Sequence, residues 1–378
     1  MRPWRIVPAI LILVGILGHQ AAGAGATTMY WGALMAGDVY GNPGAARWDR
    51  QVWDTFERNA GKEVTMVHIG LGWGTFETAA LETISGRGAI PLLTMGLEGA
   101  TLADVAAGNQ DGVIRSWAQK AKAYGLPFLF RPWWEVNGDW YPWGRDPSFI
   151  PAWRHFHDVV VAEGATNVSW AWVVNGLWDD PLSDPAPYYP GDAYVDWVGF
   201  DSYNWGESPV QDDRWETPDE VLTPTIERLK QIAPGKPICI CEVASTEFGG
   251  DKPSWIKDLL TRYLPQHPEV KAFLWFNWNV EQSGGRFDWQ IESSDLARQA
   301  FVRAIQRNPT YRSTLPALTP LAKVPMPDAG STDRGRPGAT GRDAAGGRTR
   351  YLLGLRYGAL RPAGARLSRR PDLLSIGE

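Results

Sequence analysis

Two glutamates in this chain stand at the ends of apolar runs, where the acids of an active site could be placed. Glu135 ends the run FLFRPWWE, and Glu242 ends the run PICICE. Two carboxyl groups can act as proton donor and nucleophile on one glycosidic bond, and a retaining pair lies about 5–5.5 Å apart. Each could instead serve only in an ion pair, as Glu135 with Arg131, because buried Arg–Glu pairs also occur for structural reasons.

The segment around Glu135 is rich in aromatic residues. Five of them lie within a few positions of the acid: Trp133, Trp134, Trp140, Tyr141 and Trp143. Indole faces stack on sugar rings, and an apolar setting raises the pKa of a carboxylic acid, as a proton donor to a glycosidic oxygen requires. The segment predicts a sugar-binding groove at a strand end, with a Trp-rich core strand as the structural alternative.

The elements that must position these acids alternate along the chain. Apolar runs predict strands, and segments with helical spacing between them predict helices. The expected strands are 29–34, 64–73, 89–97, 128–135, 167–175, 195–204, 237–246 and 270–279. The expected helices are 45–62, 75–85, 102–124, 148–163, 219–232, 254–263 and 294–306, with a Pro- and Tyr-rich loop before the sixth strand. Strands without polar alternation indicate a parallel sheet that is buried on both faces. Eight strand-and-helix units of this kind predict a single-domain α/β fold, namely a (β/α)₈ TIM barrel over residues 27–315.

A barrel of this kind places function at the C-terminal ends of its strands. The fourth and seventh strands face each other across its mouth, so Glu135 and Glu242 can flank one bond. Counting with a period of two puts Ile238, Ile240 and Glu242 on the inner face of the seventh strand and both cysteines on the outer face. The same count gives the fourth strand an inner set of Leu129, Arg131, Trp133 and Glu135, with Arg131 below the acid.

The two ends of the chain differ from its middle. Arg2 and Arg5 precede an apolar run and a small-residue stretch that ends at Ala26. This order predicts a signal peptide over residues 1–26, a secreted or periplasmic protein, and no stable membrane insertion. Residues 322–378 are rich in Gly, Arg and Pro without periodicity, which is typical of a disordered tail.

Composition narrows the possible partners. The chain has 21 Trp and a formal net charge of -5, which favours a carbohydrate partner and argues against nucleic acid. The five His are scattered, so we expect no metal and no cofactor, and His68 is interpreted as a core histidine. Cys239 and Cys241 are two apart on one strand and cannot form a disulfide without bending the backbone. We expect a monomer.

Three segments resemble a known family. RPWWEVNGDWYPWG resembles the signature of glycoside hydrolase family 26, and VDWVGFDSYN and ICEVAST resemble its sixth-strand and nucleophile segments. The resemblance covers 30–308 and implies a retaining (β/α)₈ hydrolase, in most members an endo-β-1,4-mannanase and in others a β-1,3-1,4-glucanase or β-1,3-xylanase. By position it makes Glu135 the acid/base and Glu242 the nucleophile. It further implies a substrate-binding set of Arg131, Trp134, Asn137, Trp140, Trp143, Tyr203 and Trp275, in which Tyr203 donates to the nucleophile and Trp140 and Trp275 stack on sugars.

One position departs from the family pattern and weakens the substrate assignment. Many family mannanases carry His before the acid/base, whereas this chain has Trp134, whose indole donates one hydrogen bond and accepts none. The leading hypothesis is a retaining endo-β-mannanase acting on mannan-type polysaccharides. The alternatives are a β-1,3-1,4-glucanase or exopolysaccharide hydrolase with the same chemistry, and a non-catalytic carbohydrate-binding barrel.

Overall fold

The computed structural model describes residues 29–208, 214–282 and 285–312. Within them, eight parallel strands close into a barrel in chain order, with β1 paired to both β2 and β8. The predicted (β/α)₈ fold is confirmed. The expected signal peptide at 1–26 and the expected tail at 322–378 lie outside the described residues.

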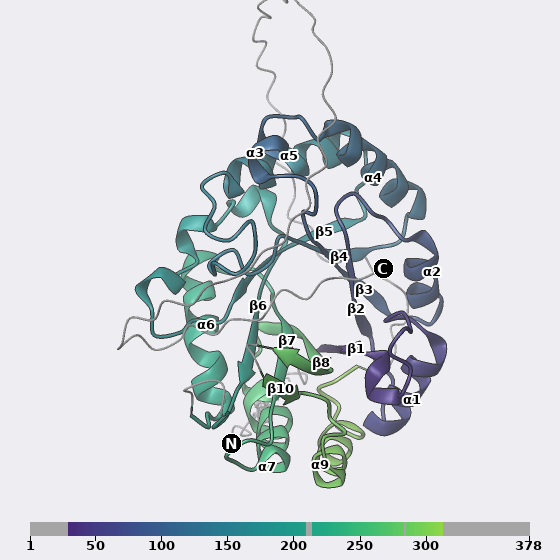
Figure 1. Ribbon diagram of the computed structural model, residues 1–378, viewed down its shortest axis with the longest axis vertical. Helices are drawn as coiled ribbons and strands as arrows, with labels where there is room; N and C mark the ends of the chain where they lie inside the picture. The colour runs from purple at the N-terminus through teal and green to yellow at the C-terminus, as the bar shows by residue number, and fades with distance from the viewer. Residues whose placement is uncertain (1–28, 209–213, 283–284, 313–378) are drawn as a thin grey trace, which may run out of the picture.

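The strands form the inner ring seen at the centre of Figure 1. They are β1 (Tyr30–Met35), β2 (Met66–Leu71), β3 (Ile90–Met95), β4 (Phe128–Pro132), β5 (Val168–Asn175), β6 (Trp197–Asn204), β7 (Ile238–Ser245) and β8 (Val270–Asn277). At one point β1 passes very close to β2, where a Cβ on Gly32 would lie 2.1 Å from the Met66 carbonyl oxygen. Only glycine fits there.

The helices form the outer layer. They are α1 (Arg50–Ala60), α2 (Thr78–Gly86), α3 (Leu102–Ala106), α4 (Asp111–Tyr124), α5 (Phe149–Ala162), α6 (Pro218–Ile232), α7 (Lys252–Asp258), α8 (Leu264–Gln266) and α9 (Asp295–Ile305). Short 3-10 turns lie at Gly37–Tyr40, Pro181–Ser183, Ala186–Tyr188 and Asp192–Tyr194, and a π-helical turn at Leu259–Tyr263. An antiparallel hairpin of β9 (Asn279–Gln282) and β10 (Gly285–Asp288) follows β8.

Most elements lie where the sequence pattern places them, with differences in the helix expected over 102–124, after β8 and at the end of β4. The single helix expected over 102–124 is broken into α3 and α4, and Gly108 in the break has a left-handed φ of 80°. The hairpin after β8 was not expected. The Pro- and Tyr-rich link between β5 and β6 holds only 3-10 turns, as expected.

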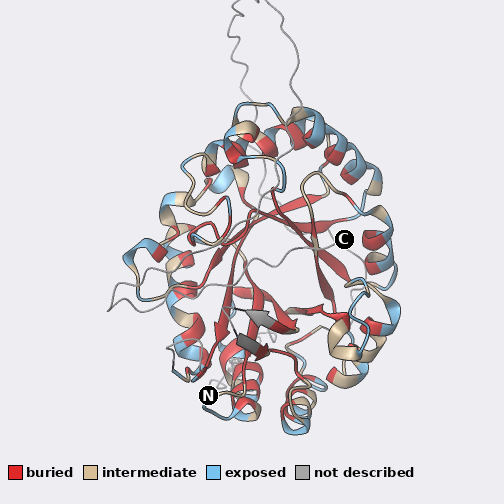
Figure 2. Cartoon of the chain, in the orientation of Figure 1, coloured by how far each residue is buried: buried red, intermediate tan, exposed pale blue. Residues whose placement is uncertain are grey.

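The core has two zones, inside the barrel and between barrel and helices. Buried residues colour the strands and the inward helix faces in Figure 2, while the outer helix faces are exposed. Nine tryptophans are among the largest fully buried side chains: Trp31, Trp53, Trp117, Trp133, Trp153, Trp172, Trp205, Trp275 and Trp289. Much of the tryptophan content therefore packs the core and does not line a groove.

Over the first half of β7, the side chains point in directions opposite to those that a period of two predicts. Cys239 pairs with Gly199, and a Cβ on that glycine would meet Cys241 Sγ at 3.2 Å and the inward Val173 at 3.3 Å. Both cysteines therefore face the barrel interior. A register shift then sets Asp201 opposite Glu242, so an extra residue in β7 lets Cys241 and Glu242 both point inward. The inward direction of Glu242 was correct, and the outward direction of the thiols was wrong.

Two searches of the described residues bear on membranes and metals. In the described ranges, no helix combines the length and apolar character that crossing a bilayer would require. Within the same residues, no group of three His, Cys, Asp or Glu side chains could hold a metal ion. Both cysteines are buried free thiols.

Candidate active site

Glu135 lies in a tight loop beyond β4, not on the strand. β4 ends at Pro132, and both Trp133 and Glu135 have left-handed backbones, with φ of 47° and 57°. Such residues cost about 1–3 kcal/mol each and concentrate at functional sites. Hydrogen bonds from the backbone N–H of Trp133 to Met95 O (3.0 Å) and of Glu135 to Val173 O (2.9 Å) hold this loop.

The left-handed turn breaks the expected alternation of this segment. Trp133 is fully buried on the helix side, where its ring lies 5.9 Å from Trp73 and 5.7 Å from Phe156. The expectation that Trp133 shares an inner face with Arg131 and Glu135 is therefore wrong. The turn sends consecutive side chains in directions that a regular strand would not allow.

The Glu135 carboxyl group is buried and held by two donors. Trp140 Nε1 donates to Oε2 at 2.6 Å, and Asn175 Nδ2 donates to Oε1 at 3.1 Å. Burial, followed by the nearby charge of Glu242, raises the pKa of Glu135 to about 7. A carboxylic acid with this pKa can hold a proton near neutral pH and release it to a substrate oxygen.

Trp140 reaches the acid because its ring lies against a glycine. A Cβ on Gly138 would come within 2.3 Å of the Trp140 ring, so any larger residue would displace the indole. The ring is partly exposed and lies 5.6 Å from Trp178. Trp140 therefore combines a hydrogen bond to Glu135 with an accessible aromatic surface, as a sugar-stacking residue requires.

Replacing Trp140 with phenylalanine separates these two features. Phenylalanine keeps an aromatic face but loses the N–H donor that lowers the pKa of Glu135. We expect the pKa of Glu135 to rise, so the fall of activity at high pH should occur at a higher pH than in the parent. The measurement is kcat/KM against pH. An unchanged profile in Trp140→Phe would show that this hydrogen bond does not act on Glu135.

Trp140→Ala should in addition weaken polysaccharide binding by about 3- to 10-fold through lost stacking.

Glu242 lies in the C-terminal half of β7 and receives two donors. Arg131 Nη1 contacts Oε1 at 2.7 Å, and the Tyr203 hydroxyl donates to Oε2. The Glu242 side chain is 12% exposed, whereas Arg131 below it is completely buried. Glu242 is therefore fixed in orientation while remaining accessible from the barrel mouth.

Arg131 lies between two carboxylates in the barrel interior. Its second amino group pairs with Asp201, which is also completely buried. Burial opposes the positive charge, but the carboxylates of Asp201 and Glu242 outweigh it and raise the pKa of Arg131. Burial and the charges of Glu242 and Asp201 likewise raise the pKa of Tyr203, which stays protonated and can donate to Glu242. The expected positions of Arg131 and Tyr203 beside Glu242 agree with this geometry.

His68 lies beneath Glu242 on β2. Its Nε2 atom is 2.7 Å from Thr94 Oγ1, and its Nδ1 atom is 3.8 Å from Glu242 Oε1. Burial and then the positive charges of Arg131 and Arg47 lower the pKa of His68 well below its usual range. The imidazole is therefore neutral and buried, as expected for a core histidine, yet it borders the carboxylate site.

Trp134, Tyr141 and Trp143 form one aromatic cluster beside the site. Trp134 lies 4.7 Å from Tyr141 and 4.9 Å from Trp143, and the Arg131 guanidinium is 5.5 Å from the Trp134 ring centroid. Trp143 Nε1 donates to the Trp134 carbonyl at 2.7 Å, and the Trp143 ring stacks on Tyr141. Trp134 and Tyr141 are each 8% exposed and Trp143 is 4% exposed, so Trp143 mainly supports the other two.

Asn137 is a positioning residue under the acid. Its amide donates to Asn175 O at 3.0 Å and to Ser183 O at 2.8 Å, and its carbonyl accepts from Asn175 N at 2.8 Å. The side chain is completely buried. These bonds fix Asn175, which in turn donates to Glu135, so Asn137 acts on the acid through Asn175 and does not face the mouth.

Trp275 lies away from the carboxylates. It is completely buried between β8 and the helices, 5.4 Å from Phe301 of α9 and 6.3 Å from Trp255 of α7. Its indole N–H donates to Trp289 O at 2.8 Å. Because neighbouring rings cover it, this structure does not bring Trp275 to the mouth as a sugar-stacking surface. Trp278, three residues on, is partly exposed at the end of β8.

Three residues of the site were not expected from the sequence. Asn175 and Asp201 are polar residues near the C-terminal ends of buried barrel strands, and that position was the available signal. Trp178 lies in the loop after β5. Its indole nitrogen is buried and has no hydrogen-bond partner within the described residues. No sequence signal distinguishes Trp178 from the other tryptophans.

The geometry gives the two glutamates different chemistry. Glu135 is buried, with a raised pKa, and receives neutral donors. Glu242 accepts hydrogen bonds from a buried arginine and a tyrosine hydroxyl, which fix its orientation. A proton donor beside a second, firmly oriented carboxyl group is what acid-assisted nucleophilic attack on a glycosidic bond needs.

Comparisons with known proteins agree with this arrangement. A family model described as glycosyl hydrolase family 26 matches residues 105–216, which include Glu135, Asn175, Asp201 and Tyr203. The chain is 32% identical over 336 residues to Endoglucanase H of Acetivibrio thermocellus, covering 83% of this chain. The chain belongs to glycoside hydrolase family 26.

Other relatives of this family 26 chain match shorter parts of it. The chain is 30% identical over 194 residues, 46% of its length, to mannan endo-1,4-beta-mannosidase A and B of Caldalkalibacillus mannanilyticus. It spans 35% of Endoglucanase H and 33% of that mannosidase, or about a third of each relative.

Solved structures share the fold. A family 26 β-mannanase from Bacteroides ovatus superposes with a TM-score of 0.55 at 19% identity, covering 79% of this chain and 94% of that chain. A mannanase from Bacillus subtilis gives 0.51 at 16% identity, covering 79% and 92%. At these identities the likeness concerns the barrel alone.

Proposed function

We propose that this family 26 chain is a retaining endo-β-glycanase that hydrolyses β-1,4-mannosidic bonds in mannan-type polysaccharides. The observation that carries the proposal is the pairing of Glu135, whose pKa is raised to about 7, with Glu242, which is held by Arg131 and Tyr203. The mannosidase named among its relatives and the accessible Trp140 ring support a polysaccharide substrate.

The proposed reaction proceeds in two displacements. Glu135 donates its proton to the glycosidic oxygen while the Glu242 carboxylate attacks the anomeric carbon, so the leaving sugar departs with a new hydroxyl group. Glu135, now ionised, then removes a proton from water. That water displaces Glu242 from the same carbon, which restores both carboxyl groups and retains the configuration. Arg131 and Tyr203 orient Glu242 during both steps.

A second candidate function is hydrolysis of a β-glucan, including mixed β-1,3-1,4 linkages. Two observations favour it. The relative named Endoglucanase H matches 83% of this chain, whereas the mannosidase of Caldalkalibacillus mannanilyticus matches 46% of it. Trp134 also stands beside the acid where many family mannanases carry His, so the sugar contacts there must differ.

A substrate panel distinguishes the candidates. The full chain is incubated with mannan, glucomannan, lichenan and β-1,3-xylan, and the release of reducing sugar is measured. Mannan and glucomannan should be cleaved if the first proposal is correct, with an initial fall in viscosity that marks endo attack. Activity on lichenan without activity on mannan would overturn the first proposal and support hydrolysis of a β-glucan.

The same panel also tests a non-catalytic barrel. A chain that only binds carbohydrate does not need one carboxyl group with a raised pKa beside a second that is oriented by an arginine and a tyrosine. If the parent chain binds these polysaccharides but releases no sugar from any of them, catalysis is overturned. Glu242→Ala serves as the negative control because it removes the proposed nucleophile.

A further inference from the structure

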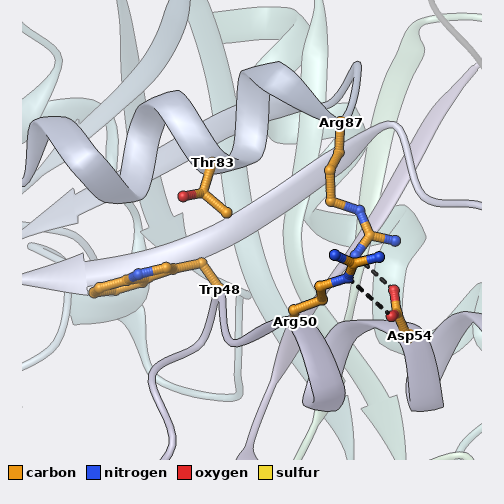
Figure 3. Close-up of a pocket in the computed structure, with 5 residues that line it drawn as sticks. All are labelled: Trp48, Arg50, Asp54, Thr83 and Arg87. Carbon is orange, nitrogen blue, oxygen red and sulfur yellow. Dashed lines mark hydrogen bonds and ion pairs between the residues drawn. The ribbon is translucent and has the colours of Figure 1, made fainter.

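A pocket on the outside of the barrel lies apart from the two carboxylates. It opens between α1 and α2, has a volume of about 490 Å³, and is lined by Trp48, Arg50, Asp54, Thr83 and Arg87 (Figure 3). Pockets for small ligands span about 300–1,000 Å³, so this one could hold one or two sugar rings. None of its residues contacts Glu135 or Glu242 in the described part of the chain.

Trp48 supplies a free aromatic surface in this pocket. It is partly exposed in the loop before α1 and packs in part against the core. No ring among the described residues stacks on it, and no described group accepts its indole N–H. A flat apolar ring with a free N–H donor suits the C–H face of a sugar and a neighbouring hydroxyl group.

The opposite side of the pocket is polar, with Arg50 largely exposed and Arg87 partly buried. Arg87 from α2 contacts Asp54 at 2.6 Å and Glu57 at 3.0 Å, and Arg50 lies 3.6 Å from Asp54. The hydrogen bond from Arg87 lowers the pKa of Asp54, so this carboxylate stays an acceptor. Planar guanidinium and carboxylate groups held in this way can bind the adjacent hydroxyl groups of a sugar.

The charge of this side argues for a neutral ligand. Two arginines face two carboxylates, Asp54 and Glu57, so their formal charges cancel. A phosphate or an acidic polymer would have to displace a carboxylate that already occupies Arg87. A neutral polysaccharide needs no such exchange.

A pocket residue, Trp48, is adjacent in sequence to a residue at the rim of the barrel mouth. Arg47, which immediately precedes Trp48, lies 4.1 Å from the Trp278 ring at the end of β8. The charge of Arg47 also acts on His68 beneath the carboxylates. Two consecutive residues therefore contact the end of β8 and line the outer pocket, respectively.

We propose that the pocket of Trp48, Arg50, Asp54, Thr83 and Arg87 is an accessory binding site for a neutral β-glycan chain. The inference rests on the proposed function, since it assigns the pocket the same class of polymer as the mouth. The site holds the polysaccharide outside the groove and raises the effective concentration of the chain near Glu135 and Glu242.

Binding is tested in a Glu242→Ala background, in which hydrolysis does not remove the polymer. Retardation in native gels that contain each polysaccharide of the panel gives the affinity. Adding Trp48→Ala should weaken polymer binding about 3- to 10-fold, as expected for a lost stacking surface. Trp48→Phe should recover part of this loss, and Thr83→Arg, which fills the pocket from the opposite helix, should reproduce it. Leu296→Ala, which removes an exposed apolar side chain from α9, is the matched control and should bind like the background chain.

The outcomes separate this proposal from the catalytic one. If the parent chain hydrolyses a polysaccharide but Trp48→Ala and Thr83→Arg bind it as tightly as Leu296→Ala, the accessory site is wrong and the activity stands. If no polysaccharide is hydrolysed but Trp48→Ala still weakens retardation, the pocket stands and catalysis is wrong. If the Glu242→Ala chain is not retarded by any polysaccharide, the accessory site is overturned. Circular dichroism of each variant identifies loss of fold.

Discussion

Replacing Glu135 with alanine should impair hydrolysis in a way that depends on the leaving group, whereas replacing Glu242 should abolish hydrolysis of every substrate. Without Glu135 no group protonates the glycosidic oxygen, so polysaccharide cleavage should fall about 10²- to 10⁴-fold. An aryl glycoside with a good leaving group needs little protonation and should still form the covalent intermediate. Glu242→Ala removes the nucleophile, and turnover of both substrates should fall on the order of 10⁴-fold or more.

Azide distinguishes the two roles. In Glu135→Ala, azide can attack the covalent intermediate without a general base, so its product should keep the configuration of the substrate. In Glu242→Ala, azide can attack only the substrate itself, and any product should be inverted. The measurement is the anomeric configuration of each azide product by NMR. An inverted product from Glu135→Ala would exchange the assigned roles, and inversion during hydrolysis by the parent chain would exclude the double displacement.

The acidity of Glu135 gives this prediction a pH dependence. The group must be protonated for the first step, and its pKa of about 7 places the loss of activity at the alkaline side of the profile. In Glu135→Ala acting on the activated aryl glycoside, this alkaline fall should disappear. Its persistence at the same pH would assign the acid to another group.

Replacing Arg131 with methionine should cost about 3–5 kcal/mol of stability, because it leaves Asp201 and Glu242 in the barrel without their counter-charge. Burial raises the pKa of Asp201, and Arg131 opposes this rise. The variant should therefore hold a proton on Asp201 to higher pH than the parent does. Its folded state binds more protons than its unfolded state, so its stability should fall as pH rises and be lower at pH 8 than at pH 5. Urea unfolding at the two pH values measures this.

Arg262→Met is the control for this variant. Arg262 also contacts two carboxylates, Asp219 and Asp258, but its side chain is 40% exposed. Surface pairs contribute about 0–1 kcal/mol, so its loss should be small. Adding Asp201→Asn to Arg131→Met should restore part of the stability by removing one uncompensated charge. Equal effects of the Arg131 and Arg262 substitutions would show that burial does not govern the Arg131 pairs.

The sequence by itself determined the barrel and the two acids at its mouth. Apolar runs with the length of buried strands, separated by helical spacing, fix the order of elements because burial and periodicity are local properties. Once the order gives eight parallel units, Glu135 and Glu242 must meet at one end of the barrel, since the C-terminal ends of all strands lie on the same side. Their positions in the chain are enough for this.

Only the tertiary structure decided how those acids are held. The inward turn of Glu242 depends on an extra residue in β7, which the pairing of β6 with β7 defines, and the position of Glu135 depends on two left-handed residues. The same holds for the bond between Arg131 and Asp201 and for the burial of Trp275 under α7 and α9. The contacts of Arg131 and Trp275 join residues about 20 to 110 positions apart in the chain. The rule that side chains alternate between two faces describes one strand at a time. It therefore cannot predict an extra residue that pairing with a distant strand introduces.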